Sequence, residues 1–384
     1  MSAPVESLHI VQIAPDVAPG SGVAGVAYEI ERALMASGAQ VSRFTRHEAG
    51  LGAAHPSRSR LGHAWDVVLF STVGTRRARA FLAARPGAIS ICHNDALVGD
   101  VYVNHGLLQA AMRARGHYVW RMARNPLHLF TAARDRIRYR GSYHRLIVAL
   151  TGREASLLTE TYSFVRPPIE VIPNGVDIER FRVPSAAERL SARGSLGLDA
   201  DSWVAVFIGH EFDRKGLPLA LDAVSRTPGV HLLVVGGTPR MIERARTTAE
   251  RVGVADRVTF VGTRTDVISP LWAADALVLP SAYEANALVV LEALACGVPV
   301  IATAVGAAAE VITDGETGYI ITRDVDDLAD RLALLRAAPA QSLGTACRAT
   351  AESRSWGAVS ARYLEVIRRL RPGDAGRELA RNDR

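Results

Sequence analysis

Short apolar runs and amphipathic stretches alternate along most of the chain, and glycine-rich or polar turns separate them. Such runs are typical of buried strands, whereas apolar positions three and four residues apart are typical of helices. Strands are predicted at 8–13, 41–45, 66–70, 88–92, 101–103, 146–150, 169–172, 203–208, 231–236, 258–261, in the run ending at 280 and in the run opening at 299. Helical patterns between them predict an α/β protein with parallel sheets.

The chain has 384 residues, which is enough for two domains of ordinary size. We assign residues 1–180 to a first Rossmann-like domain and residues 181–355 to a second. Residues 182–200 are polar and rich in Ala and Ser, so a linker is predicted there. A last long helix is expected from residue 356, followed by a polar tail.

The stretch 278–302 combines a strand, a polar turn, a helix and a second strand. A helix that follows a parallel strand presents free N–H groups, here near Ala287 and Leu288, and these suit a phosphate. Glu284 before the helix and Glu292 inside it can accept hydrogen bonds from sugar hydroxyls. These features outline a nucleotide-sugar site. The alternative is a surface Glu and a capping Glu on an ordinary helix.

The cationic residues are almost all arginine, and Lys215 is the only lysine among 45 Lys and Arg residues. Lys215 lies between a predicted strand and helix, next to Arg214 and within a loop bounded by Gly209 and Gly216. A compact ammonium suits a single phosphate contact.

The first domain offers weaker signals. A turn at residues 20–22 leads into a helix, and its glycines, Gly22 among them, let the backbone approach a ligand. His93, Asp100 and His105 lie in a segment that ends two strands, and ligands in open α/β sheets gather at the carboxyl ends of strands. Each of the three could equally be a solvated or capping residue.

Glu284-x7-Glu292 followed by EALACGVPVIAT resembles the signature of the retaining glycosyltransferases of family 4. The resemblance implies a GT-B fold, in which two Rossmann-like domains face each other across a cleft. PNGVDIERF at 173–181 is similar to the family motif at the domain crossover, and the resemblance is densest over 173–356. It also implies that the final helix, within 356–384, crosses back to the first domain.

The resemblance implies roles for single residues. FIGHEFDRKGL is similar to the motif that places Arg214 and Lys215 on the donor diphosphate, with Gly209 in the same loop. His105, after DVYVN, matches a His that touches the donor sugar, ahead of Asp100 and His93, and the spacing there also resembles the lipopolysaccharide core glucosyltransferases. The family has a Gly pair near residue 21, where Ser21 replaces the first and Gly22 keeps the second.

The implied donor site continues on the helix. Glu284 would hold the sugar and Glu292 the ribose, with Asn286 and the amides of Ala287 and Leu288 lining the phosphate and sugar. The family has Gly on both sides of Asn286, whereas this chain has Ala at both positions, which could shift the choice of donor sugar. VGAAAE at 305–310 is similar to a family GGxxE turn but lacks its second Gly.

Residues 106–145 are helical in pattern and contain nine Arg against one acid, Asp135, so their net charge is 9 − 1 = +8. Aromatic residues are interleaved, and Pro126 predicts a break into at least two helices. This composition suits an anionic membrane surface or an anionic acceptor. A solvated arginine-rich face is the alternative, and although such charge also attracts nucleic acid, no nucleic-acid partner is expected.

Composition and the cysteine count indicate where the protein is expected in the cell. No apolar run reaches the length of a membrane span, and the N-terminal residues lack the features of a signal peptide. Three scattered cysteines suit a reducing compartment. We therefore expect a cytoplasmic protein, peripheral on the inner membrane face if residues 106–145 bind lipid.

Neither a DxD-type pair beside a strand end nor a His/Cys cluster occurs in the sequence, so no metal and no cofactor are expected besides the nucleotide-sugar cosubstrate. The positive charge of Arg214, Lys215 and the helix start would stabilise the leaving diphosphate. The resemblance implies transfer of a hexose-type sugar with retention by front-face attack. UDP-sugars are favoured over GDP-sugars, and the acceptor would be a hydroxyl of a glycan, glycolipid or small molecule.

Other classes of protein remain as alternatives. A sugar-nucleotide epimerase shares the fold, but not the helix with two glutamates. A GT-B phosphorylase that uses pyridoxal phosphate needs a Schiff-base lysine, and the only lysine lies in the phosphate motif. A non-catalytic basic protein that binds membrane or nucleic acid would explain residues 106–145 and nothing in the second domain.

Overall fold

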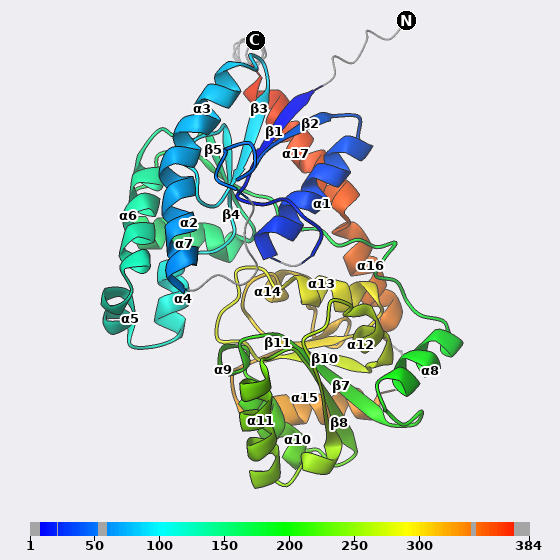
Figure 1. Cartoon of the computed structure of the whole chain (residues 1–384). Helices are drawn as coiled ribbons and strands as arrows, with labels where there is room; N and C mark the ends of the chain where they lie inside the picture. The colour runs from blue at the N-terminus through cyan, green and yellow to red at the C-terminus, as the bar shows by residue number, and fades with distance from the viewer. Residues whose placement is uncertain (1–7, 21, 53–59, 339–342, 372–384) are drawn as a thin grey trace, which may run out of the picture. The chain divides into compact units, whose positions relative to one another are not determined.

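The computed structural model describes residues 8–20, 22–52, 60–338 and 343–371. Contacts divide the chain into two compact units (Figure 1): the first comprises Met1–Asn174 and Trp356–Arg384, and the second Gly175–Ser355. The predicted boundaries, after residues 180 and 355, differ from this division by residues 175–180. Predictions that concern Ser21 and the tail from residue 372 lie outside the described residues.

The first unit is built on a parallel sheet in which six described strands follow the order β2-β1-β3-β4-β5-β6. These are β2 (Gln40–Phe44), β1 (His9–Ile13), β3 (Ile89–His93), β4 (Val101–Asn104), β5 (Leu146–Ala149) and β6 (Ile169–Val171). β3, β4 and β5 are buried over their full length. Strands enclosed on both faces are typical of parallel sheets covered by helices.

Helices cover both sides of this sheet (Figure 1). They are α1 (Gly22–Ala36), α2 (Arg60–Leu69), α3 (Thr75–Ala83), α4 (Leu108–Ala114), α5 (Tyr118–Arg124), α6 (Pro126–Arg140), α7 (Gly152–Tyr162) and α17 (Trp356–Leu370). α17, the last described helix, packs on α1. Residues 106–145 therefore form three helices, and the break predicted at Pro126 is confirmed, since α6 begins with this residue.

The strand predicted at residues 66–70 is wrong. These residues end α2 and enter a short π-helix, η1 (Phe70–Gly74), which continues directly into α3. The apolar run there is too short to distinguish a strand from a buried helix by its pattern alone. Burial of Phe70, Ser71 and Gly74 on one side of this continuous helix outweighs the strand propensity of the preceding valines.

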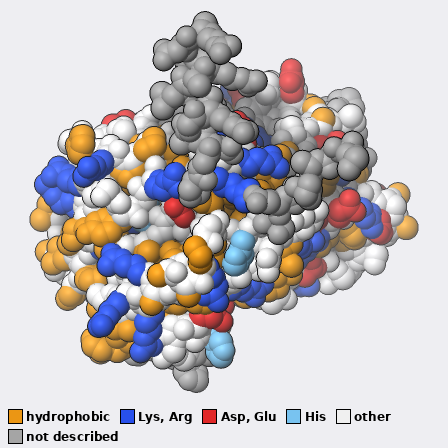
Figure 2. Space-filling model, turned by 90° about the horizontal axis from the view of Figure 1, so that it is seen from above, with side chains coloured by type: hydrophobic (Ala, Val, Ile, Leu, Met, Phe, Trp, Pro, Cys, Tyr) orange, Lys and Arg blue, Asp and Glu red, His pale blue; other side chains and the backbone are white. Residues whose placement is uncertain are grey.

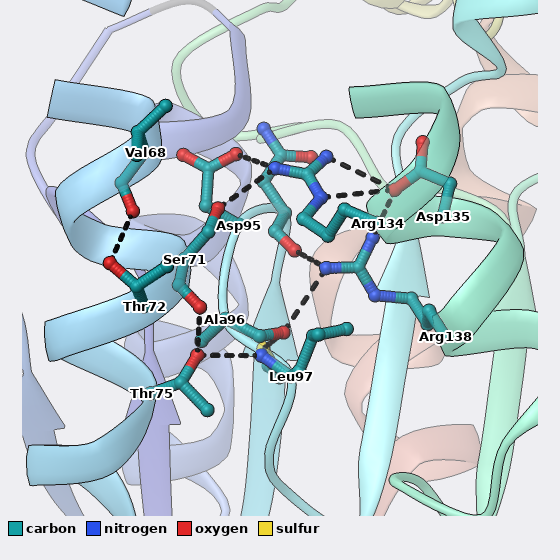
Figure 3. Close-up of polar contacts among 12 residues, drawn as sticks. Val68, Ser71, Thr72, Thr75, Asp95, Ala96, Leu97, Arg134, Asp135 and Arg138 are labelled. Carbon is teal, nitrogen blue, oxygen red and sulfur yellow. Dashed lines mark hydrogen bonds and ion pairs between the residues drawn. The ribbon is translucent and has the colours of Figure 1, made fainter. Parts of the chain in front are cut away.

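Two arginines of α6 are buried rather than solvated (Figure 3). Arg134 donates to Asp95 at 2.7 Å, and both Arg134 and Arg138 pair with Asp135, at 3.1 and 2.6 Å. Arg138 also donates to carbonyl oxygens of the loop 94–96. These bonds attach the loop that follows β3 to α6, so the two charges do not belong to the surface predicted for residues 106–145.

The second unit contains another parallel sheet, whose six described strands follow the order β12-β11-β10-β7-β8-β9. They are β12 (Gly318–Ile321), β11 (Val300–Thr303), β10 (Ala276–Leu279), β7 (Trp203–Ile208), β8 (Val230–Val235) and β9 (Val258–Gly262). Along β7, Val204 and Val206 join one apolar cluster and Ala205 and Phe207 another. Successive side chains point to opposite faces, so the sheet has a core on each side.

Helices enclose both cores. They are α8 (Ala186–Ser195), α9 (Phe212–Lys215), α10 (Leu217–Arg226), α11 (Pro239–Arg251), the short 3-10 helix η2 (Ala255–Arg257), α12 (Ile268–Ala273), α13 (Leu288–Ala295), α14 (Ala308–Val311), α15 (Val325–Ala337) and α16 (Gly344–Ser353). None of the helices in the described part of the chain is long and apolar enough to cross a membrane.

The linker predicted at residues 182–200 is also wrong, because most of it is α8. Ser185 and Glu188 form a capping box at the start of this helix. Arg189 and Arg193 then pair with Asp275, at 2.7 and 2.8 Å. These buried and half-buried bonds make α8 an integral part of the second unit.

Candidate functional site

One carboxylate oxygen in the second unit receives three donors. Oε1 of Glu284 lies 3.1 Å from Nη1 of Arg214, 3.0 Å from Nζ of Lys215 and 3.0 Å from Oγ of Ser281. Glu284 is 9% exposed, so this is a largely desolvated cluster of two cations and one anion. The structure thus brings together the three residues to which the sequence assigned the donor diphosphate and sugar.

The loop after β7 positions the two cations. Lys215 ends α9, and a Cβ on Gly209 would lie only 2.0 Å from its Cδ, so the lysine side chain needs glycine there to lie along the backbone. Arg214 is held at 2.5 Å by Glu211 and donates to the carbonyl oxygen of Tyr283. Burial lowers the pKa of Arg214, but Glu284 and Glu211 outweigh it and raise the pKa overall.

The loop that carries Glu284 is fixed by the neighbouring strand. Thr303, at the end of β11, donates from Oγ1 to the carbonyl oxygen of Ser281 at 2.6 Å. Gly306, with φ of +57°, packs against the same loop, and a Cβ there would lie 3.0 Å from the carbonyl oxygen of Glu284. The first glycine of VGAAAE thus allows the close approach, and Ala307, at the position of the missing second one, caps α14 in ordinary helical geometry.

The helix predicted within the stretch 278–302 begins at Leu288 and ends at Ala295, with Ala287 as its N-cap. The N–H groups of its first turn have no carbonyl of their own helix to bind. Glu292 is half-buried inside this helix, and burial raises its pKa to about 7, although Arg180 and Lys215 lower it. A carboxyl group with such a pKa is only partly ionised at neutral pH.

Asn286 lies between Glu284 and the start of α13. Both Oδ1 and Nδ2 of its amide are buried and have no hydrogen-bond partner among the described residues. An unsatisfied buried amide costs free energy, typically about 1–3 kcal/mol. A ligand with donor and acceptor groups would satisfy it.

In the part of the chain that the structure describes, His, Cys, Asp and Glu side chains form no group of three that could hold a metal ion.

The first unit holds a second polar group, at the carboxyl ends of β1, β3 and β4. Nδ1 of His93 lies 2.8 Å from Nε2 of His105, and Nε2 of His93 lies 2.6 Å from Oε1 of Gln12. Gln12 and His93 are fully buried, and His105 is half-buried. Burial lowers the pKa of His105 to about 4 and, together with the neighbouring His105, lowers the pKa of His93 well below its usual value.

Asp100 does not join this group. It precedes β4 and accepts hydrogen bonds from N and Oγ of Ser90, at 2.9 and 2.8 Å. β4 separates it from His105 by four residues of about 3.3 Å each, so the two lie at opposite edges of the sheet. The prediction that Asp100 lies at a carboxyl end was wrong, because the strand begins after this residue rather than before it.

Gly22 opens α1 with φ of +77°, and a Cβ there would meet nothing within 4 Å. Gly22 is therefore placed as predicted, at the start of a helix that follows β1. Its role toward a ligand stays a prediction.

Sequence reasoning missed Gln12, Ser281 and Thr303. Gln12 had a visible signal, since it is a polar residue inside the apolar strand β1. Ser281 and Thr303 are short polar residues at strand ends, which are common in any α/β protein, so nothing in the sequence distinguished them.

The family match to known proteins lies within the second unit. Residues 188–351 match the family described as Glycosyl transferases group 1. A D-inositol 3-phosphate glycosyltransferase of Mycolicibacterium paratuberculosis is 36% identical over 217 residues, which cover 54% of this chain and 48% of the relative. The chain thus spans about half the length of this curated relative.

Solved structures match almost the whole chain. WaaG, a glycosyltransferase involved in lipopolysaccharide biosynthesis, is 22% identical with a TM-score of 0.73, and the match covers 93% of this chain and 99% of WaaG. HepE of Anabaena, solved with UDP-glucose, is 20% identical with a TM-score of 0.67, and the match covers 94% and 100%. Residues 188–351, which make up most of the second unit, thus match the glycosyl transferases group 1 family, and the chain has the GT-B fold.

Proposed function

We propose that this protein is a glycosyltransferase that moves a hexose-type sugar from a nucleotide diphosphate sugar to a hydroxyl of a glycan, glycolipid or small-molecule acceptor. The observation that carries the proposal is the cluster of Arg214, Lys215 and Glu284, inside the residues that match a glycosyltransferase family. Two cations beside a helix start suit a diphosphate, and a carboxylate between them suits a sugar.

In this proposal Arg214 and Lys215 bind the diphosphate and stabilise the charge that it gains as the leaving group. Charges that are already held in place cost little reorganisation during the reaction, which is the main source of electrostatic catalysis. The bonds from Arg214 to Glu211 and to the carbonyl oxygen of Tyr283 provide this order before a donor binds.

Glu284 accepts hydrogen bonds from hydroxyls of the transferred sugar, and Glu292 accepts them from the ribose. Asn286, whose amide has no partner among the described residues, is placed between them and contacts the donor. The N–H groups of Ala287 and Leu288 line the phosphate and sugar. In the first unit, His105 contacts the donor sugar.

UDP-sugars are the favoured donors. The support is that HepE, with the same fold, was solved in complex with UDP-glucose. The acceptor is left at the level of a hydroxyl, because the match to a D-inositol 3-phosphate glycosyltransferase covers only about half of that protein.

The proposal includes two features of mechanism. Transfer proceeds with retention of configuration, by front-face attack in which the leaving phosphate takes the proton of the acceptor. It requires no divalent ion, since Arg214, Lys215 and the start of α13 supply the positive charge that a metal supplies in other transferases.

Titration calorimetry with UDP and with GDP, followed by a screen of UDP- and GDP-sugars for turnover, tests the proposal. We expect UDP to bind more tightly than GDP and a UDP-hexose to be consumed. If neither nucleotide binds and no sugar is transferred or hydrolysed, the glycosyltransferase assignment is refuted. Interconversion of the sugar without transfer would favour the epimerase alternative.

We also propose that the outer face of α5 and α6 binds an anionic membrane surface. The exposed apolar residues Val119, Trp120, Leu129 and Ile137 lie on these helices. Exposed arginines occur in the same segment of the chain: Arg113, Arg115, Arg124, Arg136, Arg140 and Arg145. On the face of the molecule seen from above, Figure 2 shows Lys and Arg side chains interspersed with hydrophobic ones, without labels for single residues. Cations attract lipid phosphates, and aromatic and aliphatic residues insert among the headgroups.

Sedimentation with phospholipid vesicles tests this surface. The protein should bind vesicles that contain phosphatidylglycerol and not pure phosphatidylcholine, and high salt should weaken the binding. Trp120→Ser should reduce the bound fraction. Leu334→Ser, at a residue 49% exposed on α15, is the matched control. Equal binding to neutral and anionic vesicles, or no effect of Trp120→Ser, would refute this role.

A further inference from the structure

Gln12, His93 and His105 form a row of hydrogen bonds, and the donor and the acceptor of each bond can be assigned. Nε2 of the Gln12 amide donates to the carbonyl oxygen of Ala27 at 3.3 Å. The reverse orientation of the amide would place two oxygens against each other. Its oxygen therefore faces His93, and since an oxygen of this kind can only accept, the hydrogen lies on Nε2 of His93.

The same reasoning assigns the donor of the hydrogen bond between His93 and His105. A neutral imidazole carries one hydrogen, so Nδ1 of His93 is an acceptor, and the hydrogen shared with the next ring comes from Nε2 of His105. Nδ1 of His105 then keeps its lone pair. Because burial lowers the pKa of both histidines, neither ring carries a second hydrogen at neutral pH.

The outer nitrogen of His105 is the open end of the row. Gln12 and His93 are fully buried, whereas His105 is half-buried at the carboxyl end of β4. Nδ1 of His105 has no hydrogen-bond partner among the described residues. The row therefore presents a hydrogen-bond acceptor at an edge of the sheet where ligands of open α/β proteins bind.

We propose that Gln12 and His93 are positioning residues that hold His105 in the tautomer whose outer nitrogen accepts a hydrogen bond. A lone pair at this nitrogen attracts a donor such as an O–H group and repels carboxylate and phosphate oxygens. The inference depends only on side chains of the first unit and is independent of the proposed function.

Tautomers can be read directly from nitrogen chemical shifts of 15N-histidine-labelled protein, with the signals of His105 identified by their loss in His105→Ala. We expect the Nε2–H form of His105 in the unmodified protein. In Gln12→Met the acceptor is lost, so Nε2–H of His93 would be buried without a partner, a state that costs free energy. His93 should move its hydrogen to Nδ1, which then donates to His105, and His105 should become the Nδ1–H form.

Two further variants separate this positioning role from a merely structural one. Gln12→Glu keeps an acceptor oxygen beside His93 and should retain the Nε2–H form of His105. Gln40→Met, the same substitution at an exposed position of the same sheet, should leave the tautomer unchanged. An Nδ1–H form of His105 in the unmodified protein, or an unchanged form in Gln12→Met, would overturn the inference, whatever the melting temperatures show.

Discussion

Replacing Glu292 with glutamine should make the protein more stable at alkaline pH and less able to bind its donor. The carboxyl group is half-buried in α13, and burial raises its pKa from 4.5 to about 7. The folded protein therefore binds this proton more tightly than the unfolded chain does. Below pH 4.5 the group is protonated in both states and costs nothing, and the cost grows as the pH rises, until it is complete above pH 7.

The expected change in the free energy of unfolding follows from the size of the pKa shift. A rise from 4.5 to about 7, at about 1.4 kcal/mol per pKa unit, corresponds to about 3 kcal/mol at full ionisation. The glutamine amide must also be desolvated, so the net gain in the free energy of unfolding should be about 1–3 kcal/mol. For a domain of this size each 1 kcal/mol raises Tm by about 2–4 °C.

The assay is the difference in Tm between Glu292→Gln and the unmodified protein at several pH values. The difference should be small at pH 5 and clearly larger and positive at pH 8. Glu243→Gln, at an exposed position on α11, is the control and should give no such trend. A difference that does not grow between pH 5 and pH 8 would refute the reasoning, because the carboxyl group would then not be ionised at the expense of stability.

The same variant tests function. If Glu292 holds the ribose, Glu292→Gln should weaken UDP binding while it raises Tm at pH 8. A residue kept only for packing would lose stability when changed and leave UDP affinity intact. Gain of stability together with loss of affinity is a combination that a structural role does not predict.

Three further predictions concern the same unit. Arg214→Ala and Lys215→Ala should each weaken UDP binding at least tenfold, because a charge-assisted bond contributes about 1.5–3 kcal/mol. Calorimetry measures the affinity, and Arg240→Ala, at an exposed position, is the control. Unchanged affinity in both variants would place the diphosphate elsewhere. Transfer should keep most of its rate in excess EDTA, and a complete loss that Mg²⁺ or Mn²⁺ restores would reveal a metal site. Glu284→Gln should lower kcat far more than it raises KM, because the proposed function has Glu284 orient the reacting sugar. Equal and mild changes in kcat and KM with a lowered Tm would indicate only a structural role.

The alternation of strands and helices was readable because buried parallel strands are continuous apolar runs. The prediction of strands failed where an apolar run belongs to a helix, as at residues 66–70, because short apolar runs in strands and in buried helices look alike. At 182–200 a signal was present and not used: Ser185 and Glu188 have the spacing of a capping box, and this box starts α8. Composition suggested a linker there, but capping chemistry was the better guide.

The candidate site was predictable only in part. Arg214 and Glu284 are 70 residues apart, and no pattern within either segment shows that they meet; the family resemblance supplied that expectation, and the structure places them 3.1 Å apart. The pairing of His93 with Gln12 joins residues 81 apart through the order of strands β1 and β3, which the sequence alone does not give. Asp100 was misplaced for a different reason: the strand that follows it was predicted at 101–103 and lies at Val101–Asn104, so Asp100 comes before this strand and not at its carboxyl end.

The charges of the cluster explain why the second unit can be ordered before it binds a donor. A buried cation without a partner would be costly, and Glu284 offsets this cost for Arg214 and Lys215 while Ser281 fills a further position on its oxygen. In the proposed function, an arriving diphosphate must compete with Glu284 for the cations, so its net gain in binding free energy is smaller than for isolated charges. In return the cations would need no reordering when charge develops on the leaving group. Glu284 would then be released toward the sugar hydroxyls, so the residue that pairs with the two cations would also orient the donor.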